Sequence, residues 1–229
     1  MLRPRPSPAP ELNTSPPARG PIESLLEDLW SGLATRDDGQ LASYIPELGR
    51  ADASVFGLSA ATLDGCVYTA GRLAPFTIQS VSKPFVYALA LADQGPDAVI
   101  RRVGVEPTGD AFNTISLDDT TSRPFNPMVN AGAIVTTSLL AGNTRQDQLA
   151  RLIDGLSAFA GRRLEVDEDV FASERATGHR NRAIAYLLRS AGAIDDDVDA
   201  QLDIHSGNAH CWLPRATCPS CPPPWPTAA

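Results

Sequence analysis

The stretch that most constrains the fold is residues 76–92, where Ser80 and Lys83 stand at the start of a long apolar segment. Residues 85–92 carry no charge, so the sequence predicts a helix that is buried on all sides. Pro84 fits the first turn of such a helix, because the N–H that proline lacks would have no partner within the helix there. The helix therefore begins near the serine and the lysine.

The spacing of Ser80 and Lys83 is typical of a nucleophile beside its base. Three residues apart on a helix, the two side chains share a face, so a neutral amine could take the hydroxyl proton. Burial and the positive end of the helix dipole both favour the neutral amine. Lys83 is the only lysine, against eighteen arginines, and arginine cannot serve as a base. The alternative is structural: a buried serine beside a lysine that extends to the surface, since this motif is short and common.

Composition indicates a soluble globular protein with one core. The chain has 229 residues, 43% of them hydrophobic, and a net charge of -8, which argues against nucleic acid and anionic membranes as partners. The sequence offers no membrane-spanning apolar run and no hydrophobic signal segment, so we expect a cytoplasmic location. Cys66 is the only cysteine before position 211, so the body of the chain has no disulfide framework.

The chain divides into a proline-rich tail, a structured body and an unusual end. Residues 1–21 contain seven prolines and are expected to be disordered. The body begins with an amphipathic helix over 22–33 and a hairpin of strands over 55–63 and 66–69, joined by a two-residue Asp64-Gly65 loop. Further helices are expected at 96–103, 131–140, 148–159 and 182–191, with polar loops at 123–130 and 173–181.

This order leaves the sheet incomplete. A hairpin alone is marginally stable, so further strands are needed. After Ile204 the sequence contains six prolines and three cysteines and shows neither helical nor strand periodicity. We expect no strand or helix there.

Four segments together resemble the glutaminase family over about residues 22–204. They are Tyr44-Ile-Pro, Gln79-Ser-Val-Ser-Lys83, Asn126-Pro-Met-Val-Asn-Ala-Gly-Ala133 and Ser173-Glu-Arg-Ala-Thr-Gly-His-Arg-Asn181. The resemblance implies an α/β (α+β) fold of the β-lactamase/transpeptidase type, a helical cluster packed on an antiparallel sheet. It also implies hydrolysis of L-glutamine to L-glutamate and ammonia, no metal or organic cofactor, and a homodimer or homotetramer.

The resemblance also assigns roles within the site. Ser80 would attack the side-chain amide carbon to form an acyl-enzyme, with Lys83 as general base and the Ser80 N–H as one oxyanion donor. Glu174 would meet the α-ammonium of glutamine. The other residues expected to contact the substrate are Tyr44, Asn130 and Asn181. Taken singly, Asn130 could be a cap and Glu174 a solvated loop charge, and only the joint pattern favours the substrate site.

The resemblance ends at Ile204, so the C-terminal strands and the second oxyanion donor of the family are missing. His205 stands where a glutaminase would carry a tyrosine. Read two bases later, residues 207–214 permit Gln-Cys-Ala-Leu-Leu-Val-Thr-Ala, the continuation expected in the family. We therefore interpret 22–204 as an incomplete glutaminase domain and 205–229 as out of frame after a one-base frameshift near Ser206. Such a chain is expected to be inactive or weakly active.

Three other interpretations compete with this one. A β-lactamase or penicillin-binding protein shares Ser-x-x-Lys but normally carries a later Lys-Thr-Gly strand, which a chain with one lysine cannot have. A noncatalytic glutamine-binding protein would keep the pocket without turnover. A zinc site in the tail has a poor ligand spacing for a structural metal site. Its ligands would be His210, Cys211, Cys218 and Cys221.

Overall fold

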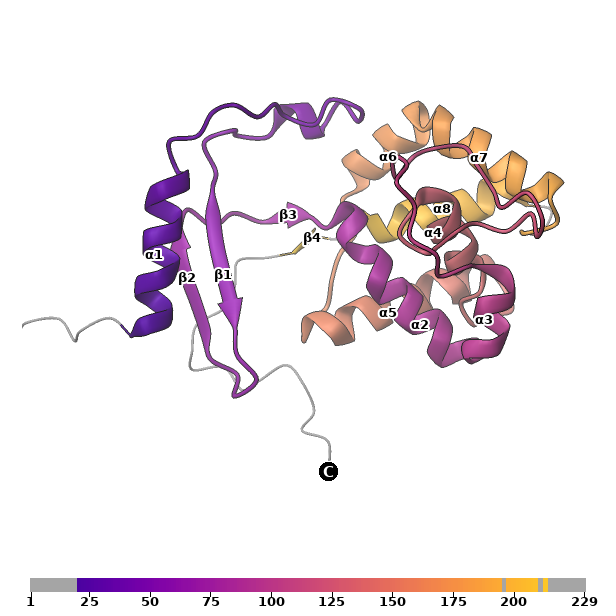
Figure 1. Cartoon of the computed structure of the whole chain (residues 1–229), viewed down its shortest axis with the longest axis horizontal. Helices are drawn as coiled ribbons and strands as arrows, with labels where there is room; N and C mark the ends of the chain where they lie inside the picture. The colour runs from indigo at the N-terminus through magenta and orange to yellow at the C-terminus, as the bar shows by residue number, and fades with distance from the viewer. Residues whose placement is uncertain (1–19, 195–196, 210–211, 214–229) are drawn as a thin grey trace, which may run out of the picture.

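The computed structural model describes residues 20–194, 197–209 and 212–213. In Figure 1, one helix and a β-hairpin lie together on one side of the molecule, and a cluster of helices lies on the other side. A short extended segment joins the two parts. The elements, in chain order, are α1 (Pro21–Leu33), η1 (Leu48–Arg50), β1 (Gly57–Ala61), β2 (Val67–Gly71), β3 (Phe76–Thr77), η2 (Gln79–Ser82), α2 (Lys83–Gln94), α3 (Pro96–Arg102), α4 (Asn130–Ser138), α5 (Arg145–Ala160), α6 (Glu168–Thr177), α7 (His179–Ser190), α8 (Val198–Ala209) and β4 (Trp212–Leu213). Most of the expected proline-rich tail lies outside the described residues.

The predicted hairpin is present, but its connection differs from the prediction. β1 and β2 pair antiparallel, from Gly57 opposite Gly71 to Ala61 opposite Val67. The prediction of a two-residue loop was wrong. Thr62 N donates to Cys66 O, so the loop between these two residues has three residues. Gly65 takes the left-handed conformation (φ 86°) that completes such a loop. One face of the hairpin is covered by α1, whose Trp30 indole N–H donates to Phe56 O at 3.0 Å.

The helical cluster is built around α4, in which every residue from Ala131 to Thr137 is buried. α2 lies beside α4 and α5, and its buried stripe comprises Val86, Leu89 and Ala90. The prediction that α2 is buried on all sides was wrong, since Pro84 and Ala92 are exposed. An uncharged helix in this position packs one stripe into the core and leaves small or weakly polar residues at the surface.

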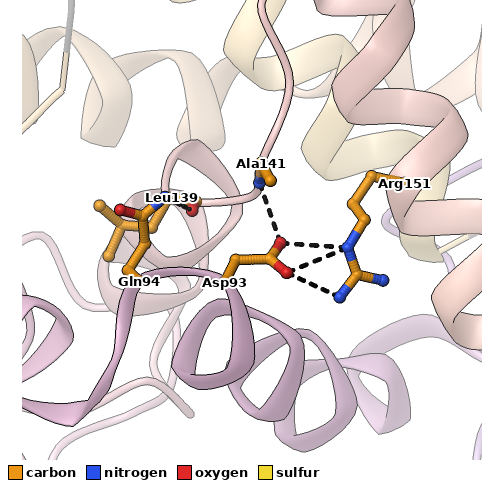
Figure 2. A network of polar contacts seen from close by, with 5 residues as sticks. All are labelled: Asp93, Gln94, Leu139, Ala141 and Arg151. Carbon is orange, nitrogen blue, oxygen red and sulfur yellow. Dashed lines mark hydrogen bonds and ion pairs between the residues drawn. The ribbon is translucent and has the colours of Figure 1, made fainter.

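The far end of α2 is fixed by a polar network, shown in Figure 2. Asp93 accepts hydrogen bonds from Arg151 Nε and Nη2 of α5 and from Ala141 N. Gln94 Nε2 donates to Leu139 O at 2.9 Å. Burial opposes the negative charge of Asp93, but these donors outweigh it and hold its pKa below the usual range. The network holds α2 in place at the end opposite Lys83.

The predicted helices at 96–103, 131–140, 148–159 and 182–191 correspond to α3, α4, α5 and α7. Two helices were missed. The second half of α6 falls within 173–181, which was predicted to be a polar loop. α8 runs to Ala209, so the expectation of no helix or strand after Ile204 was wrong. β4 adds a two-residue antiparallel pairing with β3, Phe76 opposite Leu213 and Thr77 opposite Trp212.

The sequence concealed α8 because several of its buried residues are polar. Asp203, His205 and Ser206 are each less than 10% exposed. Asp203 forms ion pairs with Arg145 of α5 and Arg175 of α6. Partners from distant helices thus satisfy polar groups that hydrophobic periodicity would place at the surface.

Candidate active site

Ser80 lies in a short 3₁₀ turn, η2, immediately before α2. The preceding residue, Gln79, has φ 46°, a left-handed conformation that costs a non-glycine residue about 1 to 3 kcal/mol. Its side chain is held by a bond to Thr77 Oγ1 at 3.1 Å. In a 3₁₀ turn residues i and i+3 eclipse each other, so Ser80 and Lys83 still share a face, although a single α-helix does not contain both. Ser80 itself is exposed.

Lys83 is the first residue of α2 and is 6% exposed. Its Nζ donates to Met128 O at 3.0 Å and to Asn130 Oδ1 at 2.8 Å, and it lies 5.3 Å from the centre of the Phe112 ring. Burial lowers the lysine pKa to about 8. A neutral amine has two N–H groups and one lone pair, so two acceptors use both donors and leave the lone pair for a hydroxyl proton. This environment suits a general base.

A directed chain of hydrogen bonds begins at Lys83 of α2 and continues through α4 and α7 to α6. Asn130 Nδ2 donates to Asn181 Oδ1 at 3.0 Å, and Asn181 Nδ2 donates to Glu174 Oε1 at 3.2 Å. The Glu174 carboxylate can only accept, so Asn181 turns its Nδ2 toward Glu174 and its Oδ1 toward Asn130, and Asn130 Oδ1 is left as the acceptor for Lys83. Helices α2, α4, α7 and α6 thereby place an amine and a carboxylate at opposite ends of one network.

The loop before α4 sets the acceptors of Lys83. Asn126 Oδ1 accepts from Met128 N at 2.9 Å and from Val129 N at 3.2 Å, and Asn126 Nδ2 donates to Glu106 O at 2.8 Å. Gly132 allows this loop to lie against α4, because a Cβ there would lie 1.9 Å from Asn126 O. The close approach holds Met128 O where it meets the lysine.

The structure brings all six residues named from the sequence to one concavity of about 60 Å³. These residues are Tyr44, Ser80, Lys83, Asn130, Glu174 and Asn181. Tyr44 is 65% exposed, and its hydroxyl donates to Gln79 Oε1 at 3.4 Å. Partial burial, then the nearby Glu174 charge, raise the pKa of Tyr44. Sequence reasoning missed four lining residues, Gln79, Ser82, Phe112 and His205.

Two of the missed residues carried a usable signal and two did not. Gln79 and Ser82 lie in the same short motif as Ser80 and Lys83, so the motif itself indicated that they are close to the site. Phe112 lies in a loop, and His205 lies beyond the four segments that carry the family resemblance. His205 is buried, with Nδ1 3.5 Å from Thr137 Oγ1 of α4.

Behind Glu174, an ion-pair cluster joins the helices that carry the site. Arg175 Nε lies 3.3 Å from Asp203 Oδ1, and Arg145 reaches the other oxygen of the same carboxylate. Asp203 is 6% exposed. The cluster connects α5, α6 and α8, so it fixes the part of α6 that presents Glu174.

Metal-ligating residues do not gather in threes within 20–194, 197–209 and 212–213. The proposed zinc ligands His210, Cys211, Cys218 and Cys221 lie outside those ranges. Across the same residues, every helix is too short or too polar to cross a membrane.

Comparisons with known proteins agree with this geometry. The sequence model of the glutaminase family matches residues 39–212. A glutaminase of Trichormus variabilis is 48% identical over 186 residues, covering 81% of this chain and 56% of the relative. Glutaminase 2 of Bradyrhizobium diazoefficiens is 52% identical over 190 residues, covering 82% of this chain and 30% of that protein. The chain thus spans about half of the first relative and less of the second.

Solved structures show the same fold. The native form of Mglu superposes with a TM-score of 0.80 at 41% identity, covering 86% of this chain and 48% of Mglu. A Bacillus glutaminase gives a TM-score of 0.72 at 32% identity, covering 84% of this chain and 62% of that structure. The expected fold class, helices with a small antiparallel sheet in the β-lactamase-like arrangement, is confirmed. The chain belongs to the glutaminase family.

Proposed function

We propose that the site around Ser80 and Lys83 hydrolyses L-glutamine to L-glutamate and ammonia. The observation that carries this is the hydrogen bonding of Lys83, whose two acceptors leave the lone pair of a neutral amine for Ser80. The chain of amides from Lys83 to Glu174 supports a substrate with an amide at one end and an ammonium at the other. The relatives are named glutaminases, and Mglu has been solved in a glutamate form.

The reaction divides into two acyl transfers. Lys83 takes the hydroxyl proton while Ser80 Oγ bonds to the side-chain amide carbon, giving a tetrahedral oxyanion. When the C–N bond breaks, the lysine returns its proton to the leaving nitrogen, which departs as ammonia and leaves an ester on Ser80. Water then attacks the ester carbon, again losing its proton to Lys83, and the returned proton restores the serine as L-glutamate leaves.

The other site residues bind rather than react. Glu174 is the acceptor for the α-ammonium, since it is the carboxylate among the residues that line the site and its Oε1 accepts from Asn181. Asn130 and Asn181 bind polar groups of the substrate, and Tyr44 lines the entrance. The Ser80 backbone N–H is one oxyanion donor, worth on the order of a hundredfold in rate in related chemistry.

The proposal extends to the organisation of the chain. We take the body of the chain as an incomplete glutaminase domain whose reading frame is lost near Ser206, so that the chain as written turns over weakly or not at all. The two-stranded sheets support this, because neither is a stable unit alone. The resemblance further leads us to propose a cytoplasmic enzyme that assembles as a homodimer or homotetramer.

The test uses a completed chain, in which residues 1–204 are fused to the remainder of the Trichormus variabilis glutaminase. We expect this protein to release ammonia from L-glutamine, and Ser80→Ala to abolish the release. Isothermal titration of Ser80→Ala with L-glutamine reports binding separately. If the completed chain binds glutamine but releases no ammonia, the noncatalytic glutamine-binding alternative is correct instead.

A further inference from the structure

The loop between α3 and α4, residues 103–129, is closed at its base by backbone hydrogen bonds. Gly104 N donates to Pro124 O at 2.8 Å, and Glu106 N donates to Phe125 O at 3.0 Å. A Cβ at position 104 would lie 2.5 Å from Phe125 O, so glycine allows the two sides of the loop to approach this closely. The base of the loop is therefore fixed, and residues 107–123 extend beyond it.

The tip of this loop is tied to two helices through adjacent residues. Asn130 N, at the start of α4, donates to Phe112 O at 2.8 Å. Arg180 Nε, on α7, donates to Asn113 O at 2.6 Å. The position of the Phe112 ring thus depends on a side chain that approaches from α7 as well as on the backbone of α4.

Phe112 covers the amine of Lys83. The centre of its ring lies 5.3 Å from Nζ, and Phe112 is 56% exposed whereas Lys83 is 6% exposed. One part of the ring therefore meets solvent while the amine beside it is buried. An aromatic face attracts an ammonium and so favours the charged amine, whereas exclusion of water favours the neutral amine. Burial is the larger effect, because the pKa of Lys83 is lowered to about 8.

Arg180 has no part in the reaction described above, and it lies at the surface. Its contact with the loop is a hydrogen bond from a charged donor, which is stronger than one between neutral groups. We propose that the hydrogen bond from Arg180 to Asn113 is a latch that keeps Phe112 over Lys83. Arg180 is then a positioning residue for the base of the proposed function, on which its effect on turnover rests, while the covering of Lys83 does not depend on turnover.

Release of the latch would change Lys83 in two ways. Water that reaches the amine raises its pKa toward the ordinary value of about 10.5, and a reagent in solution reaches Nζ more easily. In the completed chain, a smaller neutral fraction of Lys83 should lower kcat several-fold at pH 7, and kcat should recover by about pH 10. Removal of the lysine itself would give no such recovery.

The other titratable groups of the site remain unchanged in this test. Three of them share the concavity with Lys83, and they come from the segment before η1, from α6 and from α8: Tyr44, Glu174 and His205. The residues that η2, α4 and α7 present to the concavity are uncharged. Arg180 is itself charged, so its removal alone raises the pKa of a nearby lysine, and a matched arginine variant is required.

The experiment uses the fact that Lys83 is the only lysine of the chain. The full 229-residue chain is treated briefly with acetic anhydride at a series of pH values, and mass spectrometry gives the rate of acetylation at Lys83. We expect a titration midpoint near pH 8 in the parent. In Arg180→Gln the midpoint should rise by at least about one pH unit, and the rate at high pH should increase several-fold. Circular dichroism checks folding, and the completed chain replaces any chain that is not folded.

Two further variants separate the latch from other effects. Arg182→Gln removes the same charge two positions along α7, but Arg182 donates to Arg175 O of α6 rather than to the loop, so the midpoint should stay near that of the parent. Phe112→Ala removes the cover and keeps Arg180, so the midpoint should rise at least as far as in Arg180→Gln. Combining Phe112→Ala with Arg180→Gln should add little, because both changes expose the same amine.

Three results would overturn the proposal. A midpoint near 10.5 in the folded parent would mean that Phe112 does not shield Lys83 from water. Equal shifts in Arg180→Gln and Arg182→Gln would mean that charge rather than the hydrogen bond acts on the lysine. An unchanged midpoint in Arg180→Gln would mean that the loop stays in place without the latch. Acetylation does not require turnover, so a completed chain that releases no ammonia would count against the proposed function and leave the latch intact.

Discussion

Lys83 and Asn130 are joined by a hydrogen bond of 2.8 Å between Nζ and Oδ1, across 47 positions of sequence. This bond connects the start of α2 to the start of α4. It makes an amide of the proposed substrate site a direct partner of the proposed base.

Replacing Lys83 by arginine should be almost as damaging as replacing it by methionine. A guanidinium keeps the charge but offers no lone pair at neutral pH, so it cannot take the serine proton. In the completed chain, kcat should fall by a factor of about 100 or more in both variants. Arginine retaining most of the activity would show that Lys83 acts electrostatically.

The pH dependence follows from the lysine pKa. Burial lowers this pKa to about 8, and the base must be neutral, so kcat/KM should rise with pH through about 8. Between that value and the ordinary pKa of about 10.5 the unfolded chain binds more protons than the folded chain. The contribution of Lys83 to unfolding free energy therefore also increases with pH over that window, and Lys83→Met should lose this contribution. A kcat/KM profile flat from pH 6 to 9 would contradict the assignment.

Asp203→Asn should weaken substrate binding more than catalysis. The change removes the charge that holds Arg175, the residue next to Glu174, so KM should rise several-fold while kcat changes little. Asp154→Asn is the control, since it removes an ion pair at the surface. The side chains of Asp154 and its partner Arg163 are 62% and 71% exposed. Steady-state kinetics of both variants of the completed chain would decide. Equal effects would mean that Asp203 has no positioning role.

Asp93→Asn should destabilise the fold. The variant leaves Arg151 without its ion-pair partner, and Arg151 is only 31% exposed. We expect a loss of about 1 to 3 kcal/mol, less than for a fully buried pair because solvent screens the arginine. Urea unfolding of the completed chain measures this loss. Asp154→Asn should lose under about 1 kcal/mol, and a loss as small for Asp93→Asn would show that the network in Figure 2 adds little stability.

The parts of this structure that could be predicted from sequence are those whose signals are local. Apolar spacing identified α1 and α5, and the Ser80 motif marked the start of α2. Asn130 and Asn181 were named through family resemblance, but their mutual bond across 51 positions depends on how α4 and α7 pack. Periodicity could not reveal α8, because its buried Asp203 is stabilised by arginines of other helices.

The chain as written should be poorly stable and should not release measurable ammonia from glutamine. At roughly 25 cal/mol per Å² of apolar area, each few hundred Å² of apolar surface that the missing strands would cover costs several kcal/mol. That is comparable with a typical total stability of about 5 to 15 kcal/mol. Thermal unfolding followed by circular dichroism, together with an ammonia assay, tests this. A cooperative transition with turnover equal to the completed chain would mean that residues 205–229 replace the expected strands.

The central claim is that Ser80 is the nucleophile of a glutaminase site. It is tested most directly by mass spectrometry of the completed chain, quenched during incubation with L-glutamine. The account predicts a peptide containing Ser80 that carries a glutamyl ester, and neither ester nor ammonia in Ser80→Ala. Ammonia release by Ser80→Ala at a rate near that of the parent would contradict it.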